Sequence, residues 1–178
     1  FATTTGIDLP GEEYGVVPSP EWKKKIFDED WLVGNTYHTS IGQYGFQVTS
    51  LELVRAVAAL ANNGYLVTPH LLTRMETGST SLNLSKRDLK VIHEGMHMVV
   101  HDEGGTGRAL DISGMDIAAK SGTAELGVSK KLVNSLITGY FPYKNPKYAF
   151  VVIMEKGDRH NPFGAVFAAK DVLEYMRD

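Results

Sequence analysis

The sequence contains no cysteine, which excludes disulfide bonds and thiolate metal ligands and leaves the redox compartment open. No run approaches the ~20 apolar residues that a membrane-spanning helix needs, so we expect no membrane segment within it. The sequence also lacks a basic block, and its formal net charge of −3 argues against a nucleic-acid partner. It shows no signal peptide and begins at Phe1, so we expect a fragment or a processed product.

The residues that are present describe an ordinary globular chain. Its 178 residues are 43% hydrophobic and 22% charged, enough for one domain with a real hydrophobic core. We find no internal repeat and no low-complexity tract, so one structural unit is the simplest expectation.

The segment from 1 to about 48 carries few periodic signals, and we expect it to be mostly irregular. Ser19-Pro20-Glu21 predicts the start of a short helix, with Ser as N-cap and Pro in the first turn. Three aromatic residues are expected to anchor the segment to the body of the domain: Trp22, Phe27 and Trp31.

Helical signals are stronger in the rest of the chain. A capping box at Thr49 and Glu52 predicts a helix that ends at Asn63-Gly64. A second helix is predicted from Ser85 to His101. A last helix is predicted to start at Asn161-Pro162 and to bury one apolar face.

Strand signals concentrate between residues 115 and 155. We predict strands over 115–125, 132–141 and 148–155, with Pro142, Asn145 and Pro146 in the turn between the last two. The short link favours an antiparallel hairpin. Residues 65–72 look extended and 78–81 look like a polar turn. The fold class is therefore α+β, an antiparallel sheet with flanking helices and an all-helical part.

The first of these strands has unusual chemistry, because it is built from small residues around Lys120-Ser121-Gly122-Thr123. Strands normally fill with β-branched and aromatic residues, and an interior glycine often marks a close approach by a ligand or a backbone. A lysine, two hydroxyls and a free strand edge would suit a peptide that ends in a carboxylate. A surface lysine beside a turn glycine is the plainer alternative.

Lys120-Ser121-Gly122-Thr123 resembles the Lys-Ser/Thr-Gly-Thr motif of penicillin-binding proteins and serine β-lactamases. The stretch Thr5-Gly6-Ile7-Asp8-Leu9-Pro10-Gly11-Glu12 resembles a signature of the class B penicillin-binding proteins, especially those of the cell-elongation machinery. Further matches follow in the family's order: Ser40-Ile41-Gly42-Gln43, Gln47-Val48-Thr49, Ala59 to Gly64, and Pro69-His70-Leu71. The family usually has glycine at the position of Tyr44, so the backbone there is expected to differ.

The resemblance implies that residues 1–178 are the C-terminal portion of one transpeptidase domain of the penicillin-binding protein and serine β-lactamase fold. It implies a peptidoglycan D,D-transpeptidase that needs no cofactor and that β-lactams inhibit. Lys120 would give electrostatic support, and the Thr123 N–H would be an oxyanion donor. Ser121 and Thr123 would bind the substrate carboxylate, with Gly122 allowing close approach. The loop at Gly104-Gly105-Thr106-Gly107 would form a mobile rim.

The nucleophile that the resemblance requires is absent from this sequence. The family's Ser-x-x-Lys motif does not occur, and its Ser-x-Asn motif matches only Ser81-Leu82-Asn83, which stands in the wrong order along the chain. We interpret Ser81 as a chance match and expect both motifs upstream of Phe1. The fragment alone is therefore expected to be inactive.

Two other functions stay open. His93-Glu94-Gly95-Met96-His97 fits the His-Glu-x-x-His signature of zinc metallopeptidases, with His101 one turn further on, so His93 and His97 are alternative metal ligands. Gly95 weakens a helix there, and no third ligand is evident. A non-catalytic binding module is the other alternative.

The resemblance also implies partners and a location. The expected partners are the D-Ala-D-Ala end of a peptidoglycan stem peptide, β-lactam antibiotics, and scaffold and glycan-polymerase proteins of cell elongation. The full-length protein would be a single-pass membrane protein, with this domain at the periplasmic face of the inner membrane.

Overall fold

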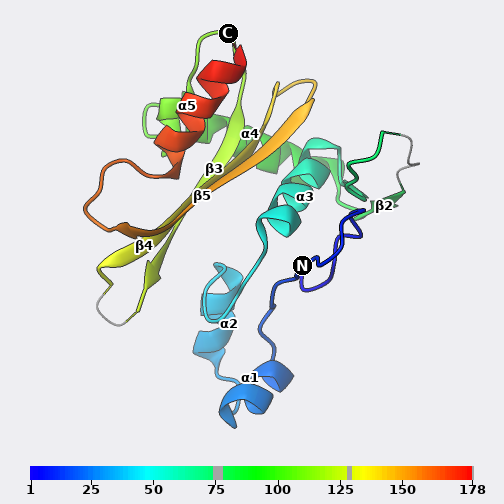
Figure 1. The fold of residues 1–178 in the computed structure, drawn as a ribbon, viewed down its shortest axis with the longest axis vertical. Coiled ribbons are helices and arrows are strands. Elements are labelled where there is room, and N and C mark those ends of the chain that lie inside the picture. The colour runs from blue at the N-terminus through cyan, green and yellow to red at the C-terminus, as the bar shows by residue number, and fades with distance from the viewer. Residues whose placement is uncertain (74–77, 128–129, 178) are drawn as a thin grey trace.

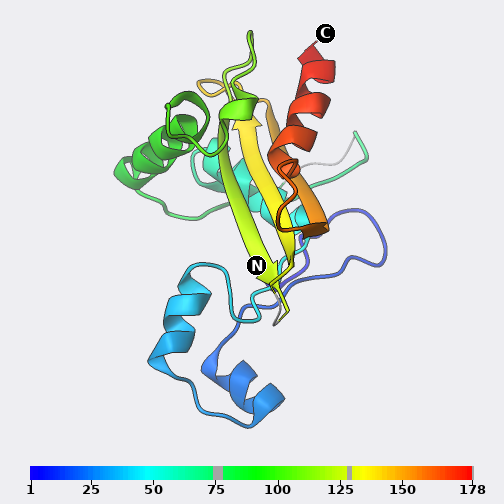
Figure 2. The same cartoon turned by 90° about the vertical axis from the view of Figure 1, so that its left-hand side faces the viewer.

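The computed structural model describes residues 1–73, 78–127 and 130–177, which form an α+β fold around a three-stranded antiparallel sheet (Figure 1). The strand order is β3 (Ala118–Leu126), β4 (Leu132–Phe141) and β5 (Tyr148–Asp158). The helices α4 (Lys86–His101) and α5 (Ala165–Arg177) lie on opposite sides of this sheet (Figure 2). Within the described residues, no helix combines the length and the apolar character needed to cross a bilayer.

The predicted hairpin is confirmed, because β4 and β5 pair antiparallel from Phe141↔Tyr148 to Leu132↔Asp158. Its connecting turn spans residues 142–147, as the prolines predicted. β5 extends three residues further than predicted. β3 begins at Ala118 rather than near residue 115, since the chain turns at residues 113–114, where Gly114 has a left-handed φ of +85°.

The sheet is covered on both faces, as the unbroken apolar run of β5 indicated. Residues of α5, of the end of α4, of the short 3₁₀ helix η1 (Arg108–Leu110) and of the sheet form the larger cluster. Its buried members are Val100, Leu110, Ile112, Ile117, Ala119, Ile137, Phe141, Ala165, Ala169 and Leu173. The second cluster joins α3 (Ser50–Ala61) and α4 to the sheet through Val57, Met96, Ala118 and Tyr140.

Tyr140 in β4 is fully buried, and its hydroxyl has no hydrogen-bond partner within the described residues. Burial raises the pKa of Tyr140 well above its usual range, so the phenol stays neutral. A buried polar group without a partner costs stability. We therefore expect Tyr140→Phe to leave the free energy of unfolding unchanged or to raise it by about 1 kcal/mol.

Urea unfolding of the intact protein measures this effect. Tyr175→Phe is the control, since Tyr175 is 85% exposed and should show no change. A clear loss of stability in Tyr140→Phe would mean that the hydroxyl makes a stabilising contact.

Both long predicted helices begin as their caps indicate. The Thr49 hydroxyl accepts from the Glu52 N–H, and the Glu52 carboxylate accepts from the Thr49 N–H, so the capping box of α3 is confirmed. The Ser85 hydroxyl caps α4 by accepting from the Asp88 N–H. After α3, Asn63 and Gly64 both have left-handed φ angles, which confirms the predicted helix end.

One helix was not predicted, and two further predictions of local structure were wrong. The segment 1–48 contains a second helix, α2 (Val33–Ser40), in addition to the predicted α1 (Pro20–Phe27). Residues 79–81 form strand β2 (Ser79–Ser81), not a turn, because they pair with β1 (Tyr65–Val67), which is also the only part of 65–72 in a strand. The last helix starts at Ala165 instead of Asn161.

The α1–α2 region projects away from the sheet as an arm (Figures 1 and 2). Its aromatic residues contact one another: Trp22 packs edge-on against Phe27 and Tyr44. Lys23 is 2% exposed and joins the two helices, donating to the Asp30 carbonyl and the Asn35 side chain and pairing with Glu29. Tyr44 has a φ of +61°, a conformation that favours glycine.

Candidate functional site

The candidate site is the β3 segment Lys120–Thr123, which lies on an edge strand. Among the described residues only β4 pairs with β3, so alternate N–H and C=O groups of β3 face away from the sheet. Ala118 and Ala119 are fully buried, whereas Lys120 and Thr123 are exposed. The strand therefore starts in the core and presents its polar residues at a free edge.

Strand alternation separates the polar side chains of β3. Lys120 and Gly122 share one face of the strand, and Ser121 and Thr123 share the other. Lys120 Nζ donates to the Ser121 carbonyl at 2.6 Å, which folds the ammonium back along the strand edge. Since all four residues lie at an edge, groups from both faces can reach a ligand placed alongside the strand.

The loop at residues 104–107 adjoins this edge. The Thr106 and Ser121 hydroxyls are 2.6 Å apart and hydrogen-bonded. Glycines fasten the loop to α4, since a Cβ on Gly105 would come within 2.3 Å of the Val99 carbonyl oxygen. The Gly107 N–H donates to that same oxygen at 2.9 Å. The sequence indicated a loop near the site, but not that its threonine contacts Ser121.

Gly122 has a local packing role as well as its proposed part in substrate approach. It lies opposite Leu136 in the β3–β4 pairing, and a Cβ at this position would be 3.0 Å from Leu136 Cγ. Such a contact is tighter than side chains normally accept. A glycine therefore lets β3 and the Leu136 side chain pack closely.

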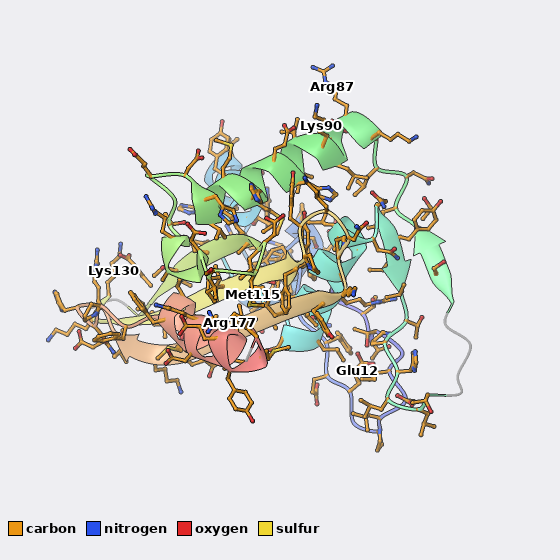
Figure 3. All side chains as sticks on the ribbon, turned by 90° about the horizontal axis from the view of Figure 1, so that it is seen from above. Glu12, Arg87, Lys90, Met115, Lys130 and Arg177 are labelled. Carbon is orange, nitrogen blue, oxygen red and sulfur yellow. The ribbon has the colours of Figure 1, made fainter. Side chains whose placement is uncertain are left out.

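Charged side chains pair at the C-terminal end of β3. Glu125 pairs with Lys130 at 3.0 Å and with Arg159 at 2.8 Å. Its hydrogen bond with Lys130, followed by the charges of Lys130 and Arg159, holds the pKa of Glu125 below its ordinary value. Figure 3 shows Lys130 at this end of the sheet, away from Arg87 and Lys90 on the outer side of α4. Beside this end, Thr123 lines a 230 Å³ pocket with Arg159 and residues near α5.

Ser81, the chance match to a catalytic serine, has a side chain whose hydrogen bonds within the described residues are both with Asn83. Its hydroxyl accepts from the Asn83 N–H and lies 3.2 Å from the Asn83 side-chain oxygen. Ser81 also lines a pocket of 720 Å³, whose lining includes no residue of Lys120–Thr123. The structure thus does not bring Ser81 into the candidate site.

The His-Glu-x-x-His pair does not assemble as a metal site. His93 Nε2 lies 2.8 Å from the Leu60 carbonyl oxygen, and its ring packs against Tyr140. His97 instead lies 2.8 Å from Asp116, while Glu94 faces solvent beside Lys90. The metallopeptidase alternative through His93 and His97 is therefore not supported. The sequence did not single out Asp116, which precedes β3.

Comparison with known proteins assigns the chain to a family. A family model described as the penicillin binding protein transpeptidase domain matches residues 1–174. The chain therefore belongs to the penicillin-binding protein transpeptidase family, and the resemblance inferred from its motifs is confirmed.

Within that family the chain is similar to proteins of the penicillin-binding protein 2 type. It is 33% identical to the peptidoglycan D,D-transpeptidase MrdA of Acinetobacter baumannii, over 98% of this chain and 29% of that protein. It is 32% identical to MrdA of Haemophilus influenzae, over 98% of this chain and 31% of that protein. The chain thus spans about 30% of the length of these relatives.

Solved structures confirm the predicted fold. The complex of penicillin-binding protein PBP2 and MreC from Helicobacter pylori matches with a TM-score of 0.85 and 31% identity, covering 99% of this chain and 33% of that one. Pseudomonas aeruginosa PBP2 in complex with WCK 5153 matches with a TM-score of 0.75 and 31% identity, covering 95% of this chain and 39% of that one. The α+β transpeptidase fold is therefore correct, and it is present in part.

Proposed function

We propose that this chain is the C-terminal part of the transpeptidase domain of a peptidoglycan D,D-transpeptidase of the penicillin-binding protein 2 type. The observation that carries the proposal is the small-residue edge strand β3, with Lys120–Thr123 exposed or half-buried along it, in a chain of this family. Its relatives are named for the same activity. An edge strand of this kind can accept an extended peptide as an additional strand.

In the proposed reaction, a serine outside this chain attacks the carbonyl carbon between the two D-Ala residues of a stem peptide. The C–N bond breaks, the terminal D-Ala leaves with a proton on its nitrogen, and an acyl-enzyme remains. An amine of a neighbouring stem then attacks the ester carbonyl and displaces the serine, which regains its proton. The product is a cross-link between two stems.

Residues of β3 bind and polarise the donor peptide in this proposal. The Thr123 N–H donates to the oxyanion of the tetrahedral intermediate, together with the N–H of the serine nucleophile. The Ser121 and Thr123 hydroxyls bind the terminal carboxylate, and Lys120 supplies the positive charge that attracts it. Thr106, which already contacts Ser121, helps to orient that hydroxyl. β-Lactams mimic the dipeptide and acylate the same serine.

The full-length protein is proposed to be a single-pass membrane protein with this domain on the periplasmic side of the inner membrane. The match to H. pylori PBP2 in complex with MreC supports a partner of the same kind, a cell-elongation scaffold protein, for this protein. A glycan polymerase is proposed as a second partner, because cross-linking acts on newly polymerised strands.

Labelling with fluorescent penicillin tests the proposal. We expect the intact protein to form a stable covalent adduct at a serine before Phe1, and the isolated 1–178 chain to form none. Peptide mass spectrometry of the adduct identifies the serine. Stable labelling of the isolated chain, or no labelling of the folded intact protein, would overturn the assignment, and the second outcome would favour a non-catalytic binding module.

A further inference from the structure

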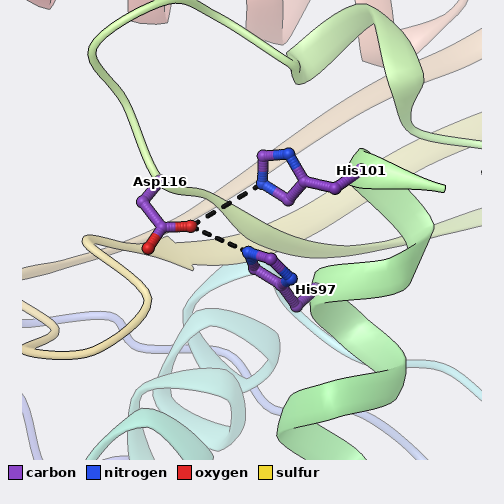
Figure 4. A group of neighbouring side chains, drawn as sticks. All are labelled: His97, His101 and Asp116. Atoms are coloured by element: carbon purple, nitrogen blue, oxygen red, sulfur yellow. Dashed lines mark hydrogen bonds and ion pairs between the residues drawn. The ribbon is translucent and has the colours of Figure 1, made fainter.

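Outside the candidate site, His97, His101 and Asp116 gather three metal-ligating side chains in one place (Figure 4). One ligand atom from each lies within 4.8 Å of the other two. His97 and His101 stand one helical turn apart at the end of α4, and Asp116 lies two residues before β3. The cluster therefore joins two elements that are separate in sequence.

The contacts of His101 leave one ring nitrogen aimed at the centre of this cluster. His101 Nδ1 is 3.1 Å from Asp111 Oδ1, so a proton on Nδ1 would be held by that carboxylate. His101 Nε2 is buried and has no hydrogen-bond partner among the described residues, and Asp116 Oδ1 lies 3.7 Å away. A buried nitrogen that lacks a partner calls for an explanation, and a metal ion would provide one.

A carboxylate behind a ligating imidazole is the usual outer arrangement of metal-bound histidine. Asp111 has this position behind His101. His97 packs against two neighbouring rings. The centroid of its ring lies 4.3 Å from the centroid of the Tyr143 ring and 4.1 Å from that of the His101 ring. The Tyr143 N–H donates to the Asp116 carbonyl at 2.7 Å, which fixes the backbone of the third ligand.

The separations of the two histidine nitrogens from the Asp116 oxygen are near those around a small tetrahedral ion. Zn²⁺ bound to imidazole nitrogen and carboxylate oxygen at about 2.0–2.1 Å places its ligand atoms about 3.3 Å apart. The 3.7 Å from His101 Nε2 to Asp116 is close to that value, and the 2.8 Å from His97 Nε2 to Asp116 has to open by about half an ångström. Side-chain rotation within a half-exposed cluster can provide this change.

We propose that His97, His101 and Asp116 bind a divalent transition-metal ion, with Zn²⁺ the best match to two imidazoles and one carboxylate, and with water as the fourth ligand. Asp111 is an outer positioning residue. The ion would tie the last two turns of α4 to Asp116, which precedes β3 and lies four residues before Lys120. A structural role is favoured over a peptidase role, since Glu94 points to solvent beside Lys90.

The test uses the intact protein, stripped with a chelator and titrated with Zn²⁺. We expect the wild type to bind one equivalent more than His101→Gln or Asp116→Asn, with affinity at this site falling by about 100-fold or more in those variants. Asp111→Asn should lose about 10-fold, as outer-shell changes do. His160→Gln is the matched control, because His160 pairs with Asp158 outside the cluster and should bind as the wild type does.

Thermal unfolding provides the second measurement. Zn²⁺ should raise the Tm of the wild type and of His160→Gln, and should leave that of His101→Gln unchanged. Equal zinc binding in the wild type and His101→Gln would overturn the proposal and leave a metal-free histidine–aspartate cluster.

Where His101→Gln does not fold, the visible spectrum of the wild type loaded with Co²⁺ decides. Intense tetrahedral bands support the site, provided that they persist in His160→Gln and disappear in Asp116→Asn. Weak octahedral bands, or intense bands that persist in Asp116→Asn, contradict the site.

Discussion

Replacing Lys120 with alanine in the intact protein is expected to lower the second-order rate of acylation by fluorescent penicillin by about 100-fold, the scale of losing one preorganised polar group in an active site. Lys120 is exposed at the edge of β3, with Nζ on the carbonyl of the neighbouring Ser121. In the proposed site its charge attracts the carboxylate of the ligand and supports the serine of the second family motif. The substitution removes the fixed positive charge of the Lys120–Thr123 segment.

Two further variants separate charge from position. Lys131→Ala removes the same charge from an exposed residue just before β4, and its acylation rate should stay within about twofold of the wild type, as expected for a screened surface charge. Lys120→Arg keeps the charge but changes its geometry, so it should recover part of the rate. If Lys120→Ala acylates as fast as the wild type, Lys120 is not part of the site.

The elements that were predictable from sequence are those with complete local signals. α3 has a capping box, a helical apolar stripe and a left-handed end, and all three are present in the structure. β5 has an unbroken apolar run and follows a short turn with two prolines, and it forms the expected hairpin with β4. In such segments the local sequence preference agrees with the tertiary environment, so the local sequence alone is enough to predict the element.

The missed elements depend on partners that are distant in sequence or on weak propensities. α2 contains a glycine and two threonines, which are poor helix formers. Asn35 and Lys23 stabilise it instead, since the Asn35 side-chain oxygen accepts from the Leu32 N–H and from Lys23 Nζ. β2 is a short, exposed, polar strand that exists because β1 pairs with it. Neither feature leaves a periodic pattern.

The candidate site likewise has features that local sequence predicts and features that depend on contacts distant in sequence. Lys120–Thr123 could be singled out from sequence because small residues and an interior glycine are unusual in a strand, and their role in the site stays a prediction. The contact of Thr106 with Ser121 was not predictable, since it joins residues 15 apart in sequence, and neither was the contact outside this site between Asp116 and His97, which are 19 apart. The metallopeptidase alternative at His93 and His97 shows the limit of spacing alone, because His93 contacts the Leu60 carbonyl oxygen at the end of α3 and not His97.

Glu52 connects the N-terminal segment, which carries the family signature, to the helical part of the domain. The side chain is 4% exposed, and its carboxylate accepts N–H bonds from Ala2 at 2.7 Å, Gly15 at 3.0 Å and Thr49 at 2.8 Å. Burial by itself would raise the pKa of Glu52. The bonds from Thr49, Ala2 and Gly15 outweigh burial and hold the pKa below its ordinary value of 4.5.

Replacing Glu52 with glutamine should therefore destabilise the fold by about 3 kcal/mol at neutral pH, because an amide turns an NH₂ toward N–H donors and leaves buried groups unpaired. A depressed folded-state pKa means that the carboxylate contributes its stability above about pH 4.5 and loses it as the pH falls through the folded value. The difference between the wild type and Glu52→Gln should shrink in that acidic range.

Urea unfolding of the intact protein at pH 7 and near pH 4 measures both effects. Glu12→Gln is the matched control, because Glu12 also accepts N–H bonds, from Thr5 and Gly6, but is only half-buried, and its replacement should cost less. A difference between the wild type and Glu52→Gln that stays constant between the two pH values would contradict an ionised Glu52. In that case the cost would come from packing, and the link between the signature segment and α3 would not depend on charge.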